Sequence, residues 1–566
     1  MAYVLSDNIL SPLGATSADN YQAVKAGRSG LREHEAKELR VPQDYVAALF
    51  SDTEAAAYAE EGLSRFEALA LASCRKALAA TEADVSGEDT VFILSSTKGS
   101  VEQMQRHDDP YPLLGDSARK IADKLGIRTQ PIVVCNACIS GTSALVLADR
   151  LLHSGRYRYA VVCGADSPSR FVISGFQSLK ALSTEPCRPF DMERFGLNLG
   201  EAAATLVLGR EPQGANCWQI GHGAVRNDAY HTTAPSKTGE GLYRALTRTL
   251  QGVDIKQLAL INAHGTATLF NDQMESVAIG RAALSTVPVN ALKGYFGHTL
   301  GAAGVLETVL TMQALDDHCL PATRGFAELG VSGKVNIVGK NASTDGHTFI
   351  KLISGFGGCN ATLLGTLEPL EPPVYNKVEL HTTHQLLLTP ETVTVDGRAL
   401  ALPPAEDGKD LLTRLYKEHV GNYPKYYKMD ALSRLGFVAS ELLLQAEGPA
   451  DETPRSDRAL LLFNRTSSVQ ADRKYLASIE NPEECWPSPS VFVYTLPNIV
   501  AGEIAIRHHY QGETGFYILG EKDEAQMTAV IESAFQDPDT TSVLAGWIDY
   551  EADDRYEAQL ALYERR

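Results

Sequence analysis

A cysteine stands where a run of strand-forming residues gives way to a helical pattern. In PIVVCNACISGTSALVLADRLLHSG, residues 131–155, the thiol of Cys138 falls at the start of the expected helix. Unpaired backbone N–H groups at a helix N-terminus lower the pKa of a thiol and favour the thiolate, which attacks carbonyl carbons. The small residues that follow leave room for a carbonyl to reach backbone N–H donors. The alternative is a buried structural cysteine, one of nine in the chain.

Two histidines occupy similar corners further along the chain. His264 ends a strand-like run in INAHGTATLFNDQMES, and His298 precedes a Gly/Ala-rich helical pattern in NALKGYFGHTLGAAGVLE. One such histidine is usually a satisfied polar group. Two of them, in a chain that also has Cys138 at a strand-to-helix corner, favour a nucleophile with two imidazole partners.

Strands and helices that could position these groups alternate along the first two thirds of the chain. Buried strands are expected at residues 91–96, 131–136, 159–165, 203–209 and 258–264. Between them, apolar residues recur at helical spacing at 66–80 and 141–155. Alternation of this kind predicts an α/β layered fold with mostly parallel connections.

Composition limits the classes of function. Of 566 residues, 44% are hydrophobic and 21% charged, as in ordinary globular proteins, and no stretch reaches the roughly 20 apolar residues of a membrane span. The formal charge of −19 opposes binding to nucleic acid. The N-terminus has no secretory pattern, so we expect a soluble, cytoplasmic protein. The cysteines lack the paired spacing of a zinc site, so we expect no metal and no disulfide.

The chain divides into two units. Proline and charge rise at residues 367–377, which predicts a first domain at 1–366, a linker at 367–385 and a second unit at 386–566. The second unit contains a helical pattern and three strand-like runs, at residues 431–445, 459–464, 515–520 and 541–547.

A weak internal repeat relates the second unit to the first. A displacement of 383 residues aligns YPLLGDSARKIADKLG with YTLPNIVAGEIAIRHH, and it places Asp166 on Asp549 (549 − 166 = 383) and Cys138 on Glu521 (521 − 138 = 383). The second copy has then lost the thiol. Chance similarity between two α/β units is the alternative.

Several segments together resemble the β-ketoacyl-acyl carrier protein synthases of the thiolase superfamily, the ketosynthases. They run in order through nearly all of residues 1–366: ILSPLGATSADNYQAVKAGRSGL, NACISGTSAL, RPFDMERFGLNLGEAAA (188–204), DAYHTTAPSKTGEGL (228–242), HGTATLFND (264–272), KGYFGHTLGAAGVLE (293–307) and SGFGGCNA (354–361). The second unit resembles the N-terminal half of the same family and stops before the histidine motifs. The resemblance implies a thiolase-like layered α-β-α-β-α fold, with a degenerate half at 386–566.

The resemblance also implies the catalytic roles. Cys138 would take an acyl chain as a thioester, and backbone N–H groups of Cys138 and Phe356 would form the oxyanion hole. His264 and His298 would hydrogen-bond the malonyl thioester carbonyl as decarboxylation turns it into an enolate. No cofactor is implied, because the substrates arrive on the phosphopantetheine of an acyl carrier protein.

Further residues receive supporting roles from the same resemblance. Lys293 would adjust the electrostatic environment of His298, with Glu307 as the partner of the lysine. The alternative is that Lys293 and Glu307 form a structural ion pair, which is equally compatible with the sequence. Five residues would contact substrate. Thr266 and Thr268 would meet the phosphopantetheine arm, Phe356 with its neighbour Gly357 would gate the acyl pocket, and Ile139 is the fifth. Ile139, where the family has a small residue, should narrow or tilt the entrance of the acyl pocket.

The implied activity is decarboxylative Claisen condensation in fatty-acid, polyketide or polyene assembly. The alternatives are an inert scaffold or chain-length partner and a thiolase-type acyltransferase without decarboxylation. The expected partners are an acyl carrier protein and a second ketosynthase-like chain, in a homodimer or heterodimer. Since half a ketosynthase cannot catalyse, residues 386–566 could instead take the place of the partner subunit. A fusion of two reading frames is equally compatible.

Overall fold

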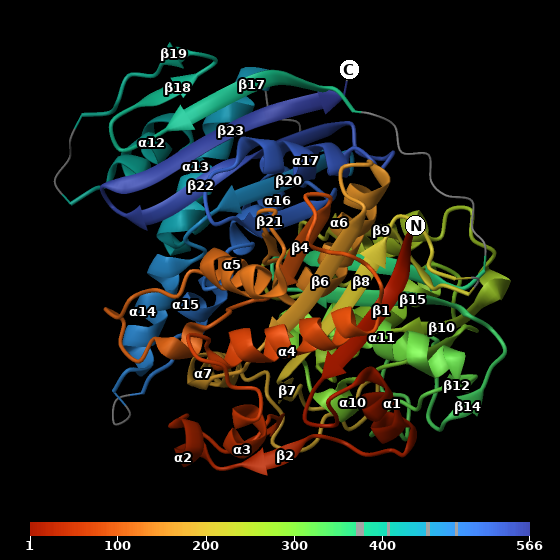
Figure 1. Cartoon of the computed structure of the whole chain (residues 1–566). Helices are drawn as coiled ribbons and strands as arrows, with labels where there is room; N and C mark the ends of the chain where they lie inside the picture. Colours follow the sequence, from red (N-terminus) through yellow and green to blue (C-terminus); the bar gives the residue numbers. More distant parts are fainter. Residues whose placement is uncertain (215, 369–377, 405–407, 449–452, 482–484, 566) are drawn as a thin grey trace.

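The computed structural model describes residues 1–214, 216–368, 378–404, 408–448, 453–481 and 485–565 (Figure 1). Within that part of the chain, no helix is both long enough and apolar enough to cross a bilayer.

Two mixed sheets form the first unit. The first has the order β5-β4-β6-β8-β1, built from Ile132–Val134, Thr90–Ser95, Tyr159–Asp166, Ala202–Gly209 and Ala2–Leu10. The second has the order β11-β10-β15-β16-β9, built from Pro288–Asn290, Leu258–Asn262, Thr348–Gly355, Cys359–Thr366 and Gln219–Asn227. Each sheet pairs a parallel part with antiparallel strands at one side, so the expectation of mostly parallel connections holds only for part of each sheet.

Helices form three layers around these sheets. Between the sheets lie α6 (Ser140–His153) and α11 (Ala303–Asp316), which pack against each other. Outside the first sheet lie α4 (Arg65–Ala79) and α5 (Leu114–Leu125), and outside the second lie α8 (Glu240–Thr249) and α9 (Leu269–Arg281). Helices α6 and α11 are buried on nearly every face because a sheet covers each side of them. The predicted α-β-α-β-α layering is confirmed.

The second unit repeats the first sheet. Its strands have the order β21-β20-β22-β23-β17, from Thr514–Ile518, Arg458–Asn464, Ser542–Ala552, Arg555–Arg565 and Leu380–Leu388. Its main helices are α13 (Ala431–Leu444), α16 (Ile499–His508) and α17 (Glu524–Ala534). The helix and strands expected at 431–547 are thus present. The linker expected at 367–385 is too long, because β17 begins at Leu380; residues 369–377 of that linker lie outside the described part.

Shorter elements connect these parts. The helices are α1 (Ser17–Lys25), α2 (Ala36–Leu39), α3 (Asp52–Ala56), α7 (Arg170–Ser178), α10 (Lys293–Phe296), α12 (Leu411–His419), α14 (Val469–Ile479) and α15 (Pro489–Tyr494). The strands are β2 (Arg32–His34), β3 (Tyr45–Ala48), β7 (Leu199–Gly200), β12 (Cys319–Leu320), β13 (Asn336–Ile337), β14 (Ala342–Ser343), β18 (Val393–Val395) and β19 (Arg398–Ala399).

The repeat suggested by the sequence has a counterpart in side-chain contacts. At the end of β6, Asp166 accepts hydrogen bonds from the backbone N–H and the hydroxyl of Thr97, each at 3.0 Å. At the same place in β22, Asp549 accepts from the N–H and hydroxyl of Thr466, at 3.1 and 2.5 Å. The displaced position of Cys138, Glu521, lies exposed before α17.

The two units meet edge to edge through one strand pair. Strand β21 pairs antiparallel with β5, with Tyr517 opposite Val134 and Ile518 opposite Val133. Since 134 + 383 = 517, this pair lies on the pseudo-twofold axis of the repeat. The two sheets form one continuous sheet, and Figure 1 shows the second unit, coloured teal to blue, lying against the first.

Candidate active site

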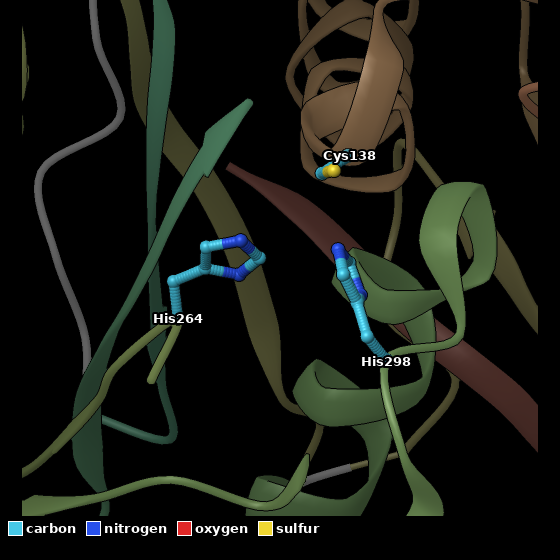
Figure 2. Close-up of side chains that lie close together, drawn as sticks. All are labelled: Cys138, His264 and His298. Atoms are coloured by element: carbon cyan, nitrogen blue, oxygen red, sulfur yellow. The ribbon is translucent and has the colours of Figure 1, made fainter. Parts of the chain in front are cut away.

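The thiol and the two imidazoles face one another. The sulfur of Cys138 and a ring nitrogen from each of His264 and His298 all lie within 4.8 Å of one another (Figure 2). The imidazole rings are 5.0 Å apart between centroids and cross at 80°. Cys138 comes from the turn before α6, His264 from the loop just after β10 and His298 from the turn before α11. Sulfur and imidazole nitrogen are also zinc ligands, so a bound Zn²⁺ would block this thiol.

The corner before α6 sets the position of the nucleophile. Ala137 takes the left-handed conformation, with φ of 48°, in the residue before Cys138. Such a conformation is costly for a non-glycine residue and persists only where the surrounding structure enforces it. It lets the sulfur lie beside the backbone N–H groups of Cys138 and Phe356, which both favour the thiolate.

The thiol is nevertheless protonated at rest. Burial raises the pKa of Cys138 to about 12, although Lys293 and the two backbone N–H groups act in the opposite direction. The expectation that the helix N-terminus lowers this pKa is therefore wrong in its net sign. Loss of solvent around a charged sulfur outweighs the backbone dipoles.

Both imidazoles are neutral. Burial lowers the pKa of His264 and of His298 well below 6.5, and the nearby charge of Lys293 lowers both further. The backbone N–H of Leu300 donates to Nδ1 of His298 at 3.2 Å, so the ring proton of His298 is on Nε2. That Nε2 and Nδ1 of His264 are buried and find no partner among the described residues. The site therefore offers an unused N–H donor beside the sulfur.

A buried ion network stands behind His264. Lys293 donates to the carbonyl oxygen of His264 at 2.6 Å and to Glu307 at 2.8 Å, while Lys351 donates to the other oxygen of Glu307. Burial raises the pKa of Glu307 but the two lysines lower it by more, so the carboxylate is charged. Burial lowers the pKa of Lys351 to about 8. Lys293 and Glu307 thus act on the backbone that carries His264.

A cavity of about 410 Å³ leads from the surface to these groups. It reaches Cys138, His264 and His298 and is lined by Thr266 and Thr268, whose hydroxyls lie 2.8 Å apart. Phe356 also lines it, from the turn between β15 and β16 that we call the gate loop (residues 356–358). The predicted substrate-contacting threonines and gate phenylalanine are therefore placed along one path to the sulfur.

A second, much smaller cavity extends beyond Cys138. Its volume is about 20 Å³, close to the space of one water molecule. Three of its lining residues, Phe492, Thr495 and Leu496, belong to the second unit. The ring of Phe492 packs edge-on against Phe176 of α7 with 5.6 Å between centroids. Each unit therefore contributes one wall of the space behind the nucleophile.

Ile139 is the one predicted substrate contact that the structure places elsewhere. It is fully buried in a small apolar cluster with Val225, Ala303 and Ile353, and it lines neither cavity. Its side chain points behind the nucleophile turn, because successive residues of a helical turn face different directions. The prediction that Ile139 narrows or tilts the entrance of the acyl pocket is therefore wrong.

The structure adds residues that sequence reasoning missed. Lys351 is the lone charge in the otherwise apolar strand TFIKLISG, a signal that could have marked it. A second thiol, Cys359, lines the large cavity and contacts the carbonyl oxygen of Phe356 at 3.2 Å. Phe492 and Asn498 come from a distant segment with no pattern that points to this site.

Sequence comparison identifies the family. Profiles described as "Beta-ketoacyl synthase, N-terminal domain" and "Beta-ketoacyl synthase, C-terminal domain" match residues 4–214 and 219–327. The chain belongs to the β-ketoacyl synthase family. A 3-oxoacyl-[acyl-carrier-protein] synthase 2 of Rhizobium meliloti is 33% identical over 275 residues, which are 45% of this chain and 65% of that protein. One from Vibrio cholerae is 29% identical over 401 residues, 63% of this chain and 96% of that protein.

Solved ketosynthase structures share the fold. The ketosynthase ApeO in complex with its chain length factor ApeC, from Xenorhabdus doucetiae, is 27% identical, has a TM-score of 0.54 and covers 65% of this chain and 98% of that one. The "PfaC Keto synthase-Chain length factor" is 15% identical, with a TM-score of 0.77, and covers 100% of this chain and 78% of that one. At that identity the likeness concerns the fold alone, and it includes the second unit.

Proposed function

We propose that this ketosynthase-family chain catalyses decarboxylative condensation of an acyl group held on Cys138 with malonyl-acyl carrier protein. The observation that carries the proposal is the convergence of one thiol and two neutral imidazoles at the end of a 410 Å³ cavity. A neutral imidazole with a free N–H donor suits a carbonyl oxygen that gains negative charge in the transition state.

The first half-reaction is acyl transfer. A bond forms between Cys138 Sγ and the acyl carbon, and the bond from that carbon to the carrier sulfur breaks. The thiol proton passes to the departing carrier sulfur. Backbone N–H groups of Cys138 and Phe356, which lie beside the sulfur, would stabilise the oxyanion in between.

The second half-reaction forms the carbon–carbon bond. The malonyl C–CO₂ bond breaks, and its electron pair becomes an enolate whose oxygen accepts from His298 Nε2–H and from His264. The enolate carbon attacks the acyl carbonyl, the bond to Sγ breaks, and the sulfur takes up a proton. Thr266 and Thr268 would hold the phosphopantetheine arm along the cavity.

We further propose that the two units have different roles. Residues 1–366 carry the chemistry, and the second unit takes the place that a partner subunit would have. The β5–β21 pairing on the pseudo-twofold axis and the absence of a thiol at Glu521 support this proposal. The partner chain is then supplied within the same polypeptide, and the acyl carrier protein is the partner that must bind from outside.

An inert chain-length partner and a thiolase-type acyltransferase are the competing functions. An inert partner needs neither a thiol nor imidazoles, so the assembled site argues against it. A thiolase-type enzyme uses a second catalytic cysteine. The sulfur of Cys359 is turned to the backbone carbonyl of Phe356, at 3.2 Å. This contact favours a packing role for Cys359.

Intact-protein mass spectrometry tests the proposal. The protein is incubated with carrier proteins loaded with short to long acyl groups. We expect one acyl adduct on the wild-type chain and none on Cys138→Ala. His298→Ala should be acylated nearly as the wild type is, but lose CO₂ release from malonyl-carrier by about 10²-fold or more. Absence of any acyl adduct on the wild type would favour an inert chain-length partner. Condensation without CO₂ release would favour a thiolase-type acyltransferase.

A further inference from the structure

The gate loop is held from both units. Its first-unit restraints include a bond from the N–H of Gly357 to the carbonyl of Thr232, at 2.7 Å, one from Asn227 Nδ2 to the carbonyl of Gly357, at 2.9 Å, and one from the N–H of Asp228 to the carbonyl of Gly358, at 2.8 Å. The second unit supplies a further restraint: Asn498 Nδ2 donates to the carbonyl oxygen of Phe356 at 2.8 Å, an oxygen that the Cys359 thiol also contacts at 3.2 Å. Asn498 is 2% exposed and starts α16.

Helix α16 lies directly on this loop. A Cβ added to Gly357 would come within 2.7 Å of Asn498 Nδ2, and one added to Gly502 would come within 2.8 Å of the carbonyl oxygen of Gly357. Gly357 also has a φ of 91°, a region that side-chain-bearing residues rarely adopt. The loop therefore has a glycine that permits movement and an amide from the other unit that opposes it.

Only one of the two polar atoms of the Asn498 side-chain amide has a hydrogen-bond partner among the described residues. Its Nδ2 has the Phe356 carbonyl, but its buried Oδ1 finds no donor among the described residues. A buried polar side chain with one atom unpaired is unfavourable for packing alone. The bond to the gate loop is the contact that accounts for an amide at this place.

The repeat provides an internal comparison. The position of the first unit that corresponds to Asn498 is Gly115, since 498 − 383 = 115. Gly115 packs against Gly520, next to the corner that has no thiol. The amide is thus present only on the side where a gate and a nucleophile face it, although both residues lie at the start of corresponding helices, Asn498 as the N-cap of α16 and Gly115 in the first turn of α5.

We propose that Asn498 is a positioning residue of the second unit, which latches the gate loop closed over Cys138 through the Phe356 carbonyl. The second unit then regulates access to the nucleophile as well as completing the fold. The biological role of the latch rests on the proposed function, because the gate would admit the acyl thioester. The hydrogen bond that holds the loop does not depend on that function.

Alkylation of Cys138 measures the latch without requiring condensation. The full-length protein is treated at one pH with iodoacetamide and, separately, with N-benzyl iodoacetamide, and the modified site is read by peptide mapping because Cys359 lines the same cavity. The ratio of the two rate constants cancels the thiolate fraction, so it reports steric access alone. The variants are Asn498→Ala and Asn498→Leu, the second keeping the volume of the side chain while removing the donor.

We expect the ratio of the rate constant for N-benzyl iodoacetamide to that for iodoacetamide to rise by about fivefold in both variants. A factor of this size corresponds to the loss of one hydrogen bond that favours the closed gate over the open one. The matched control is Gln526→Ala, which removes another amide-to-carbonyl bond between the units, from Nε2 to the carbonyl of Gln130 at 2.8 Å, away from the gate. An unchanged ratio in the Asn498 variants, or an equal rise in Gln526→Ala, overturns the latch. A wild-type chain that never condenses, together with a raised ratio in the Asn498 variants, would overturn the proposed function and leave the latch standing.

Discussion

The protonation of three side chains decides the chemistry at the residue scale. The thiol of Cys138 is protonated at rest, and both histidines are neutral, because the surrounding protein atoms disfavour the charged form of each group. Lys293 and Lys351 strengthen the neutrality of the imidazoles by placing two positive charges nearby. A neutral His298 with its proton on Nε2 is the form that can donate to a carbonyl oxygen.

The pH dependence of condensation follows from this. Because the pKa values of both imidazoles lie well below 6.5, neither ring takes up a proton as the pH falls through that value. We expect the rate of CO₂ release by acylated enzyme to stay level between about pH 7.5 and 6.5 and to fall only at lower pH. The measurement is a pH–rate profile with saturating malonyl-carrier. A half-maximal rate near pH 6.5 would show that one imidazole titrates as in water.

At the scale of elements, α7 and α15 meet across the boundary between the units and close the space behind Cys138. Gly175 of α7 lies so near Phe492 of α15 that an added Cβ would be 2.1 Å from the ring. Phe492 also packs against Tyr475 of α14, with ring centroids 5.2 Å apart. The ring is therefore held on two sides and limits the depth of the cavity.

Shortening this side chain should change the preferred acyl length. We expect Phe492→Ala to raise the rate of acylation by a medium-length chain, relative to an acetyl group, by about tenfold, since each additional buried methylene contributes about 0.8 kcal/mol. Competition between two acyl-carrier thioesters, followed by mass spectrometry, gives the ratio. Val493→Ala is the control, because Val493 is the next residue of α15 and does not line the cavity. Equal ratios in the two variants would contradict the assignment of Phe492.

Buried charge joins the units at the scale of the whole molecule. Arg226 of β9 donates to Asp537 at 2.7 Å, and Arg150 of α6 donates to Glu513 at 2.8 Å, all four side chains being almost fully buried. Removing one partner of such a pair leaves an unpaired charge in the interior. Together with the β5–β21 pairing, these contacts make the two units one continuous structure.

The edge that a second copy would need is already used inside the chain. Because an isologous dimer through β5 requires that strand to be unpaired, β21 blocks it. Size exclusion coupled to light scattering should therefore give the mass of one chain, 61.2 kDa. A particle of two chains at micromolar concentration would mean that the homodimer or heterodimer implied by the family resemblance forms through another face.

The local sequence was sufficient to find the thiol, the two imidazoles and most of the elements of the first unit. The corner at Cys138, the glycine-rich turns after His264 and His298, and the alternating apolar runs are short-range patterns, and the residues they identify do come together. The same patterns located the helix and strands of the second unit, including the repeat that relates Asp166 to Asp549.

Only the tertiary structure decided how these parts act on one another. The pKa of Cys138 depends on how much water the surrounding layers exclude, so a helix N-terminus read from sequence gave the wrong sign. The direction of Ile139 depends on the backbone of the nucleophile turn. Asn498 and Phe492 reach the site only because β21 pairs with β5, a contact between segments about 380 residues apart that no local pattern specifies.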